Sequence, residues 1–436
     1  MTRPASHTLP VQSAPAATPG IAVDNPFART RLAVAIIAVL SGLALVSAIL
    51  FQAPQILGAE KALTDFDAFH VAGRLALEGR AEDAYRVRTM LAAQNRITGT
   101  VGFMPWTYPP PFTMLVKGLA ILPIGLAFML FIAPTFALYL VVVRRIAGAL
   151  LPGVLIVMLP TLLLMMRTGQ NGFLTGGLIG LFLLAHLARR AGAGLPLGLM
   201  VLKPHLAMGI TLITLMERRW AAVAIAAVTV LGLLLVSTLT LGLPVWQGFA
   251  DGVRESSGFL RDGHYRLFRM TSLYATTYTL GAGPALAMAV HAAGALAAIT
   301  LLVLAWRRNA EPRLLAAIAC CTSLFVSPYN YDYDLTILGL AAAFVLPDLL
   351  QRTRPLEQLG LVLLAWSATG YGMTCSILTG DSVPGVDPGQ PDRGGGIPAL
   401  MAPLLLLLIA CVARALQRAP GSSERVETQA VGLARP

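Results

Sequence analysis

The sequence has few charged residues for its length. Asp, Glu, Lys and Arg make up only 12% of the 436 residues, whereas 56% are hydrophobic and the mean hydropathy is +0.72. Soluble globular domains contain about 25% charged residues. The scarcity of charge therefore excludes an ordinary soluble domain, and it predicts an all-α, polytopic integral membrane protein.

Cysteine is also scarce, and no Cys-x-x-Cys occurs among the four cysteines. Three of them, Cys320, Cys321 and Cys411, lie in apolar runs, which predicts small buried hydrophobic side chains rather than disulfides. The histidines show no spacing typical of a metal site, and no nucleotide-binding signature is visible. We therefore expect no metal and no tightly bound cofactor.

The net charge of +11 comes from basic residues placed in pairs at the ends of apolar runs. An excess of Lys and Arg in cytoplasmic loops explains this pattern, so we prefer it to nucleic-acid binding. Clusters at Arg307–Arg308, Arg352–Arg354 and Arg414–Arg418 are then cytoplasmic. This orientation places the polar stretches 52–107 and 243–280 on the outer face of the cell inner (plasma) membrane.

Apolar runs predict roughly 10 to 13 membrane segments, some of them broken. The first covers about 32–51, after a tail at 1–30 that is expected to be disordered and cytoplasmic. One transmembrane domain, 31–416, is followed by a second such tail at 417–436. Within 191–217, Lys203-Pro204 predicts a break that lets the chain enter and return. Apolar spacing over 69–79 predicts an interfacial amphipathic helix.

Charged groups at the edge of hydrocarbon are expensive and are kept for a reason. Asp65 and Asp67 follow the first apolar run, and either carboxylate is a candidate general base, with solvated loop acids as the alternative. Lys203, beside His205 in an apolar run, is a candidate phosphate ligand or the partner of a structural ion pair.

Two further polar motifs lie at predicted outer boundaries. Gly169-Gln170-Asn171 offers side-chain amides, with a helix cap as the alternative. The stretch 327–335 contains three tyrosines and two aspartates, which are typical of an aromatic belt or of a sugar-binding rim. A helix-start cap is a specific alternative for Asp334.

Basic residues in the outer stretch 243–280 run against the usual distribution, which suggests an anionic partner. They could equally form a solvated face of an amphipathic segment. The residues concerned are Arg254, Arg261, His264, Arg266 and Arg269.

Taken together, these motifs resemble glycosyltransferase family 87, a group of GT-C-fold enzymes related to polyprenol-phosphate-mannose-dependent mannosyltransferases. The matching pieces cover about 60–340 in the family's order. They are Asp65-Phe66, Phe69-x-x-Ala72-Gly-Arg-Leu-Ala-Leu-x-Gly79, Ala84-Tyr85, Tyr108-Pro-Pro, Leu122-Pro123, Gly169-Gln170-Asn171, Lys203-Pro204, Ser272-Leu273-Tyr274, Ser327-Pro328 and Tyr333-Asp334-Leu335.

The resemblance implies an inverting transfer of a hexose, mannose by analogy, from a polyprenyl-phosphate donor that serves as co-substrate to a lipid or glycan acceptor. Asp65 matches the catalytic acid position of the family and would act as the base. The predicted donor-phosphate residues are Lys203, His205, Arg261, His264, Arg266 and Arg269. The predicted sugar or acceptor residues are Asp67, Tyr108, Gln170, Asn171, Tyr329, Asn330, Asp332 and Asp334.

Three other functions are compatible with the pattern. Broken helices with polar groups also mark transporters of polar or anionic solutes. A ligase or polymerase of lipid-linked glycans would have a similar basic outer loop, and a membrane scaffold without activity is the third alternative. No inverted repeat is visible, and the polar motifs gather at the outer face rather than at the midplane, which disfavours a transporter.

Overall fold

The computed structural model describes residues 26–57, 63–98, 103–379 and 396–419. Over these ranges the chain is α-helical, and its only β-type pairing is one isolated antiparallel bridge between Met270 and Tyr331. The predicted all-α, polytopic fold class is confirmed. Most of the two predicted tails lies outside the described residues.

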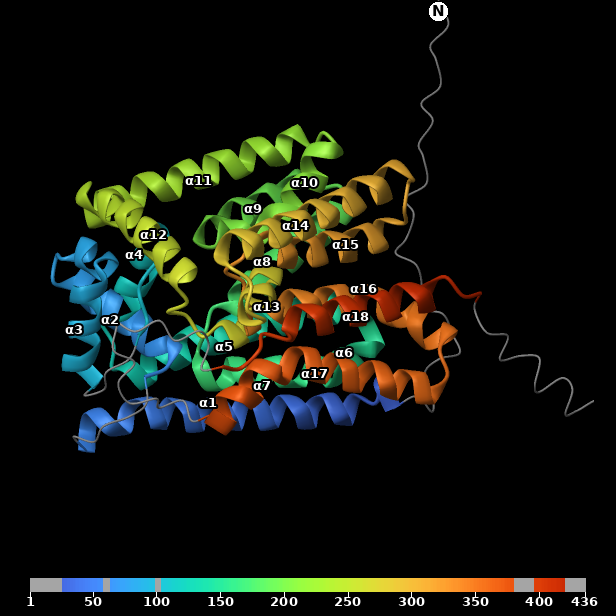
Figure 1. Cartoon of the computed structure of the whole chain (residues 1–436), viewed down its shortest axis with the longest axis horizontal. Helices are drawn as coiled ribbons and strands as arrows, with labels where there is room; N and C mark the ends of the chain where they lie inside the picture. The colour runs from blue at the N-terminus through green and yellow to red at the C-terminus, as the bar shows by residue number, and fades with distance from the viewer. Residues whose placement is uncertain (1–25, 58–62, 99–102, 380–395, 420–436) are drawn as a thin grey trace, which may run out of the picture.

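Six helical segments are long and apolar enough to cross a membrane, and Figure 1 shows most of them running side by side along the long axis of the molecule. Their helices are α1 (Thr30–Leu57), α5 (Ile124–Ala147), α11 (Trp220–Leu241), α14 (Pro284–Arg307), α16 (Thr336–Arg352) and α17 (Pro355–Thr379). Five shorter apolar segments bring the number to eleven in the described ranges, within the predicted 10 to 13. They are α8 (Gly172–Leu187), Ala191–Leu202, Pro204–Met216, α15 (Pro312–Val326) and α18 (Met401–Leu416).

Several segments are broken in the structure. Short α4 (Pro110–Leu119) precedes α5, and α6 (Leu151–Val157) is separated from α7 (Leu159–Thr168) just before Pro160. The predicted break at Lys203-Pro204 is confirmed. There, α9 (Gly194–Leu199) gives way to short 3-10 turns before α10 (Met208–Met216). Backbone that leaves the helix inside a bundle is free to present polar groups to a protected site.

The first polar stretch folds into α2 (Asp65–Leu77), η2 (Ala81–Tyr85) and α3 (Val87–Thr98). The helix predicted over 69–79 is present, but it begins at Asp65, and the predicted interfacial placement is wrong because most of its residues are buried. A Cβ at Gly73 would lie 2.3 Å from the Val116 carbonyl oxygen, so only glycine permits this contact with α4. Apolar spacing does not distinguish a helix that faces lipid from one that faces protein.

The second polar stretch folds into α12 (Pro244–Asp262), η7 (Leu267–Arg269) and α13 (Leu273–Thr279). Helix α12 packs on η2, where Gly252 contacts the backbone of Tyr85 and the Phe249 ring lies 5.8 Å from that of Tyr85. Figure 1 shows α2, α3 and α12 together at one end of the bundle. The two polar stretches therefore meet on one side of the molecule.

The opposite end of the bundle is basic. In Figure 1, α11 begins and α14 ends there, which places Arg218–Arg219 and Arg307–Arg308 far from α12. Arg189 and Arg218 end their helices with positive φ angles of 56° and 54°, a position that usually takes glycine. Basic residues at one end and polar stretches at the other match the predicted separation of charge.

Candidate active site

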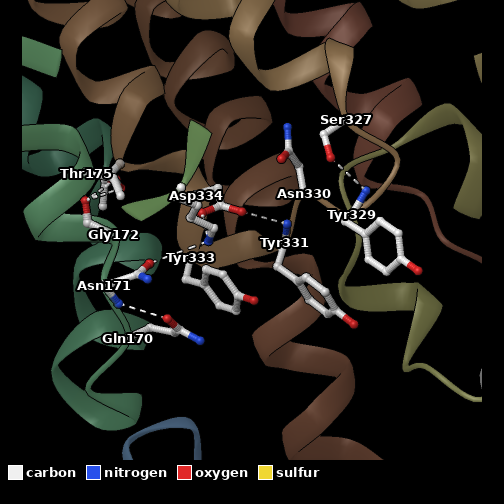
Figure 2. Close-up of polar contacts among 12 residues, drawn as sticks. Gln170, Asn171, Gly172, Thr175, Ser327, Tyr329, Asn330, Tyr331, Tyr333 and Asp334 are labelled. Carbon is white, nitrogen blue, oxygen red and sulfur yellow. Dashed lines mark hydrogen bonds and ion pairs between the residues drawn. The ribbon is translucent and has the colours of Figure 1, made fainter. Parts of the chain in front are cut away.

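A buried polar cluster forms where segments from six parts of the chain meet. We define the polar cluster as the side chains of Asp65, Tyr108, Gln170, Asn171, Lys203, Arg269, Tyr331, Asp332, Tyr333 and Asp334. They come from the start of α2, the segment before α4, the turn between α7 and α8, the break between α9 and α10, η7, and the loop before α16. Figure 2 shows the α7–α8 turn facing this last loop.

Asp65 is the first residue of α2, and its position follows from the helix start. Thr64 adopts an extended conformation and caps the helix, so the Asp65 side chain projects from the first turn. One carboxylate oxygen, Oδ1, accepts a hydrogen bond from Gln170 Nε2 at 3.0 Å, and Oδ2 lies 4.0 Å from Arg269 Nη2. The side chain is 16% exposed.

Asp67 occupies a different environment, although it is only two residues away. It is fully buried, and its Oδ2 accepts from the Thr64 backbone N–H at 2.9 Å and the Thr64 hydroxyl at 3.0 Å. This pair is a capping box, in which a residue in the first turn satisfies the otherwise unpaired N–H of the cap. The geometry therefore gives Asp67 a role in starting α2 rather than in contacting a sugar or acceptor.

The turn at Gly169-Gln170-Asn171 is held by close packing. Gly169 has φ of +68° and ends α7, and a Cβ there would lie 2.8 Å from Phe66 and Phe128. A Cβ at Gly172 would meet the Tyr333 carbonyl at 2.2 Å, so the turn approaches the loop before α16 directly. Figure 2 shows the Gln170 and Asn171 side chains leaving this turn in different directions.

Lys203 forms a buried ion pair with Asp334. Their Nζ and Oδ1 atoms are 2.6 Å apart, and the side chains are 7% and 0% exposed. The ammonium also lies 4.5 Å from the centre of the Tyr333 ring and 3.5 Å from Asn171 Oδ1. Asp334 Oδ2 accepts from the Tyr331 backbone N–H at 3.1 Å, so the predicted helix-start cap and the ion pair coexist.

Arg269 forms the second buried ion pair, with Asp332. Nε and Nη2 each donate to one carboxylate oxygen at 3.0 Å, and the side chains are 13% and 0% exposed. Burial opposes the charge on Arg269, but the carboxylates of Asp332 and Asp65 outweigh it and hold its pKa above the usual value. Arg269 is therefore a permanent cation beside Asp65.

Tyr331 and Tyr333 also belong to the cluster; they lie in the stretch 327–335 that the sequence marked as a possible sugar-binding rim, but they were not among the predicted site residues. Their rings stack at 5.3 Å with an interplanar angle of 10°, and Arg269 lies 6.0 Å from the centre of the Tyr331 ring. The sequence feature that could have identified them is the alternation Tyr-Asp-Tyr-Asp over 331–334. In the structure this stretch forms a short 3-10 turn, and both its tyrosines and its aspartates belong to the polar cluster. Cations over aromatic faces are stabilised by the ring quadrupole.

Other predicted site residues lie outside this cluster. Arg261 is 68% exposed and pairs with Asp262 at 3.3 Å on the surface of α12. His264 packs among aromatic rings, with Phe259 at 5.5 Å and Phe103 at 6.0 Å. Arg254 is 73% exposed. None of these contacts joins them to the polar cluster.

Four more predicted residues are not members of the polar cluster. Tyr329 donates to the Ser256 carbonyl and its ring lies 5.8 Å from that of Tyr265. Asn330 is fully buried and donates to the Leu324 carbonyl at 2.7 Å, which closes the end of α15. His205 follows Lys203 and Pro204 in a short 3-10 turn, and Arg266 is half-buried. No grouping of three or more His, Cys, Asp and Glu residues that could hold a metal ion occurs in the described ranges.

The arrangement has a simple electrostatic structure. Three carboxylates and two cations meet in the polar cluster, and two of the carboxylates are fully buried in short ion pairs. Asp65 is the third carboxylate. It is bonded by a neutral amide, it lies farther from the cation, and it keeps some solvent exposure. Asp65 is therefore the least tightly paired carboxylate of the polar cluster.

The polar cluster lies within a bundle of apolar helices, six segments of which are long enough to cross a membrane. The family model of glycosyltransferase family 87 matches residues 106–328, just over half of the chain. The chain belongs to this family, and it is a membrane glycosyltransferase. No curated protein and no solved structure matches it.

The matched region covers only part of the polar cluster. Tyr108, Gln170, Asn171, Lys203 and Arg269 lie within 106–328, whereas Asp65 precedes that range and 331–334 follows it. Tertiary contacts join the three parts. The bond from Gln170 to Asp65 and the ion pair of Lys203 with Asp334 each link a matched residue to one outside the match.

Proposed function

We propose that this glycosyltransferase moves a hexose from a polyprenyl-phosphate donor to a hydroxyl of a lipid or glycan acceptor, with inversion and with Asp65 as the general base. The observation that carries the proposal is the contrast among the three carboxylates of the polar cluster. Asp332 and Asp334 are fully buried in ion pairs, whereas Asp65 is 16% exposed and bonded by an amide. A base must be reachable and must not already be tightly paired.

The reaction is a single displacement. Asp65 takes the proton of the acceptor hydroxyl as its oxygen attacks the anomeric carbon, and the bond from that carbon to the phosphate oxygen breaks. The electron pair of the broken bond leaves with the polyprenyl phosphate, and attack from the opposite side inverts the anomeric centre. Oδ1 of Asp65 is bonded by Gln170, whereas Oδ2 lies 4.0 Å from Arg269 Nη2, beyond hydrogen-bond distance, so Oδ2 is the oxygen suited to take the proton.

Charge on the leaving phosphate needs positive groups and hydrogen-bond donors. Lys203 and Arg269 are the cations of the polar cluster, and each keeps N–H groups beyond those bonded to its aspartate. Asn171 Nδ2 is buried and has no well-aligned hydrogen bond in the described part of the chain, although it lies near the Tyr108 hydroxyl. Preorganised donors of this kind stabilise developing charge without reorganisation.

The apolar surface of the bundle is compatible with contact with the polyprenyl chain of the donor. Helices α1, α11 and α14 expose many large apolar side chains, among them Val39, Leu231 and Leu296. We propose that the protein lies in the plasma membrane with both termini in the cytoplasm and the polar cluster toward the outer side. The basic ends of α11 and α14, away from α12, support this orientation. Mannose as the transferred sugar is taken from the family resemblance.

The test uses the full-length protein in lipid nanodiscs with radiolabelled mannosyl- and glucosyl-polyprenyl phosphate and a glycolipid extract as acceptor. We expect wild-type transfer, and Asp65→Asn should lower kcat by about 10³-fold, within the range that general bases contribute. Asp251→Asn is the matched control, because Asp251 is 55% exposed on α12 and removal of its charge should leave kcat unchanged.

Transfer by Asp65→Asn at the wild-type rate would refute the assigned base. Solute uptake by proteoliposomes, without sugar transfer by the wild type from either donor, would instead favour the transporter. Chain extension of a lipid-linked glycan without use of the monosaccharide donors would favour the ligase or polymerase.

A further inference from the structure

We infer that Gln170 is the positioning residue of the base: it fixes the Asp65 carboxylate so that Oδ1 is bonded and Oδ2 faces the acceptor. The inference rests on the proposed function, and it gives Gln170 a different role from the sugar contact that the sequence suggests. Gln170 is 3% exposed, and its Nε2 donates to Asp65 Oδ1 at 3.0 Å.

The orientation of the Gln170 amide is determined by its neighbours. Its oxygen, Oε1, accepts from the Tyr108 hydroxyl at 3.0 Å and from the Asn171 backbone N–H at 2.9 Å. An amide flipped end for end would place Oε1 against the Asp65 carboxylate and its NH2 group against the Asn171 N–H. Both contacts would be repulsive, so the amide has one orientation, with its NH2 group toward Asp65.

The Tyr108 hydroxyl is a dependable donor in this chain of bonds. Burial raises the pKa of Tyr108, and the negative charges of Asp334 and Asp65 raise it further. Its hydroxyl therefore keeps its proton across any pH range in which the enzyme is assayed. The backbone on the other side is equally fixed, because Gly169 packs between Phe66 and Phe128.

A neutral donor suits the position better than a cation would. A cation at 3.0 Å from Asp65 would stabilise the carboxylate and weaken it as a proton acceptor, whereas an amide orients it with a smaller effect. Arg269, from η7, lies farther away, with Nη2 at 4.0 Å from Oδ2, and its charge is already paired with Asp332, to which Nε and Nη2 each donate at 3.0 Å. Gln170 thus fixes the position of the Asp65 carboxylate, whereas Arg269 and Asp332 determine the charge around it.

Two substitutions test the role. Gln170→Met keeps the length of the side chain and removes the donor, and we expect kcat to fall about 10- to 100-fold, as for other residues that orient a reacting group. KM for the donor should stay within about twofold, because the substrate contacts remain. Gln170→Glu places a second carboxyl against Asp65, so the two groups share a proton and the acidic limb of the kcat profile moves to higher pH by about one unit or more.

A surface pair in the same chain provides the control. Gln247 Nε2 donates to both oxygens of Asp251, at 3.1 and 3.0 Å, on the exposed side of α12. The same two substitutions at Gln247 should leave kcat and its pH profile unchanged. Tyr108→Phe is a further variant that removes one of the two donors fixing Gln170, and it should lower kcat several-fold without moving the pH limb.

The outcomes separate this inference from the proposed function. Transfer by the wild type, with Asp65→Asn inactive and both Gln170 variants showing wild-type kcat and pH profile, would overturn only the role of Gln170. Absence of transfer in the wild type and in the Gln247 controls would overturn the proposed function itself. Should the Gln170 variants not fold, as judged by size-exclusion chromatography, an unchanged kcat in Tyr108→Phe would count against the inference.

Discussion

The polar cluster and the exposed face of α12 lie in neighbouring parts of the protein and contain the same residue types. Both contain an ion pair of 2.6 Å, Lys203 with Asp334 in the cluster and Arg254 with Asp251 on α12. The first pair is 7% and 0% exposed, and the second is 73% and 55% exposed. The two ion pairs therefore have the same N···O distance but very different solvent exposure, and the buried pair is the one whose charges are strongly coupled.

The difference has a functional side. On the surface each charged group is solvated, so its neighbours change its behaviour little and its position is loosely defined. In the polar cluster each group is bonded to residues from other segments, and the geometry is correspondingly fixed. Three predictions, besides those for Asp65 and Gln170, test this contrast.

The largest effect on stability is expected at Lys203. Lys203→Met leaves the buried Asp334 carboxylate without its cation, which should lower the free energy of unfolding by about 3–5 kcal/mol and abolish transfer. Arg254→Met on α12 should cost no more than about 1 kcal/mol. Thermal unfolding in detergent, followed by tryptophan fluorescence, measures both. Equal effects of the two substitutions would show that burial does not distinguish these pairs.

The double variant Lys203→Met/Asp334→Asn sharpens this result. Removing both charges avoids an uncompensated buried carboxylate, so part of the lost stability should return while transfer stays absent. A double variant as active as the wild type would mean that Lys203 is not needed for the leaving phosphate.

An intermediate effect is expected at Gly372 in α17. A Cβ there would lie 2.6 Å from Asp332 Oδ2, so Gly372→Ala should displace the carboxylate that holds Arg269 and lower kcat about tenfold, the cost typical of a disturbed supporting contact. Gly360→Ala, in the same helix, meets no atom within 4 Å and should be neutral. Steady-state transfer assays on both variants provide the comparison, and equal rates would show that the position of Asp332 does not matter for transfer.

The smallest effect is expected at Arg261. This residue was a sequence candidate for the donor phosphate, but it is 68% exposed and pairs with Asp262 on the surface. Arg261→Ala should change kcat/KM for the donor less than twofold, as is usual for solvated surface charges. A tenfold rise in KM for the donor would show that α12 contacts the phosphate after all and that the distinction between the two regions fails.

The sequence was sufficient for the class of fold because that class depends on composition and short-range pattern. Scarce charge and long apolar runs predicted the helical membrane bundle, and Lys203-Pro204 predicted a break that the structure confirms. The order of short motifs predicted the glycosyltransferase family, which the family match confirms. Each of these signals is local in the chain.

Several details of the site were beyond the sequence because they depend on packing between distant segments. Composition could not separate Asp65 from Asp67, and only the capping box with Thr64 shows that Asp67 is turned into its own helix start. Likewise, the basic residues of 254–269 looked equivalent, yet only Arg269 forms an ion pair with a cluster carboxylate in the described structure. The roles of these residues in catalysis remain predictions.

By itself, then, the sequence determined that the chain spans a membrane, that the segment at Lys203-Pro204 is broken and which family the chain belongs to. The tertiary structure decided which charges meet. Asp65 is separated by 105 positions from the amide that holds it, and Lys203 by 131 from its aspartate. Hydropathy and motif spacing describe neighbours along the chain, whereas the strength of a buried charge pair depends on groups that only folding brings together.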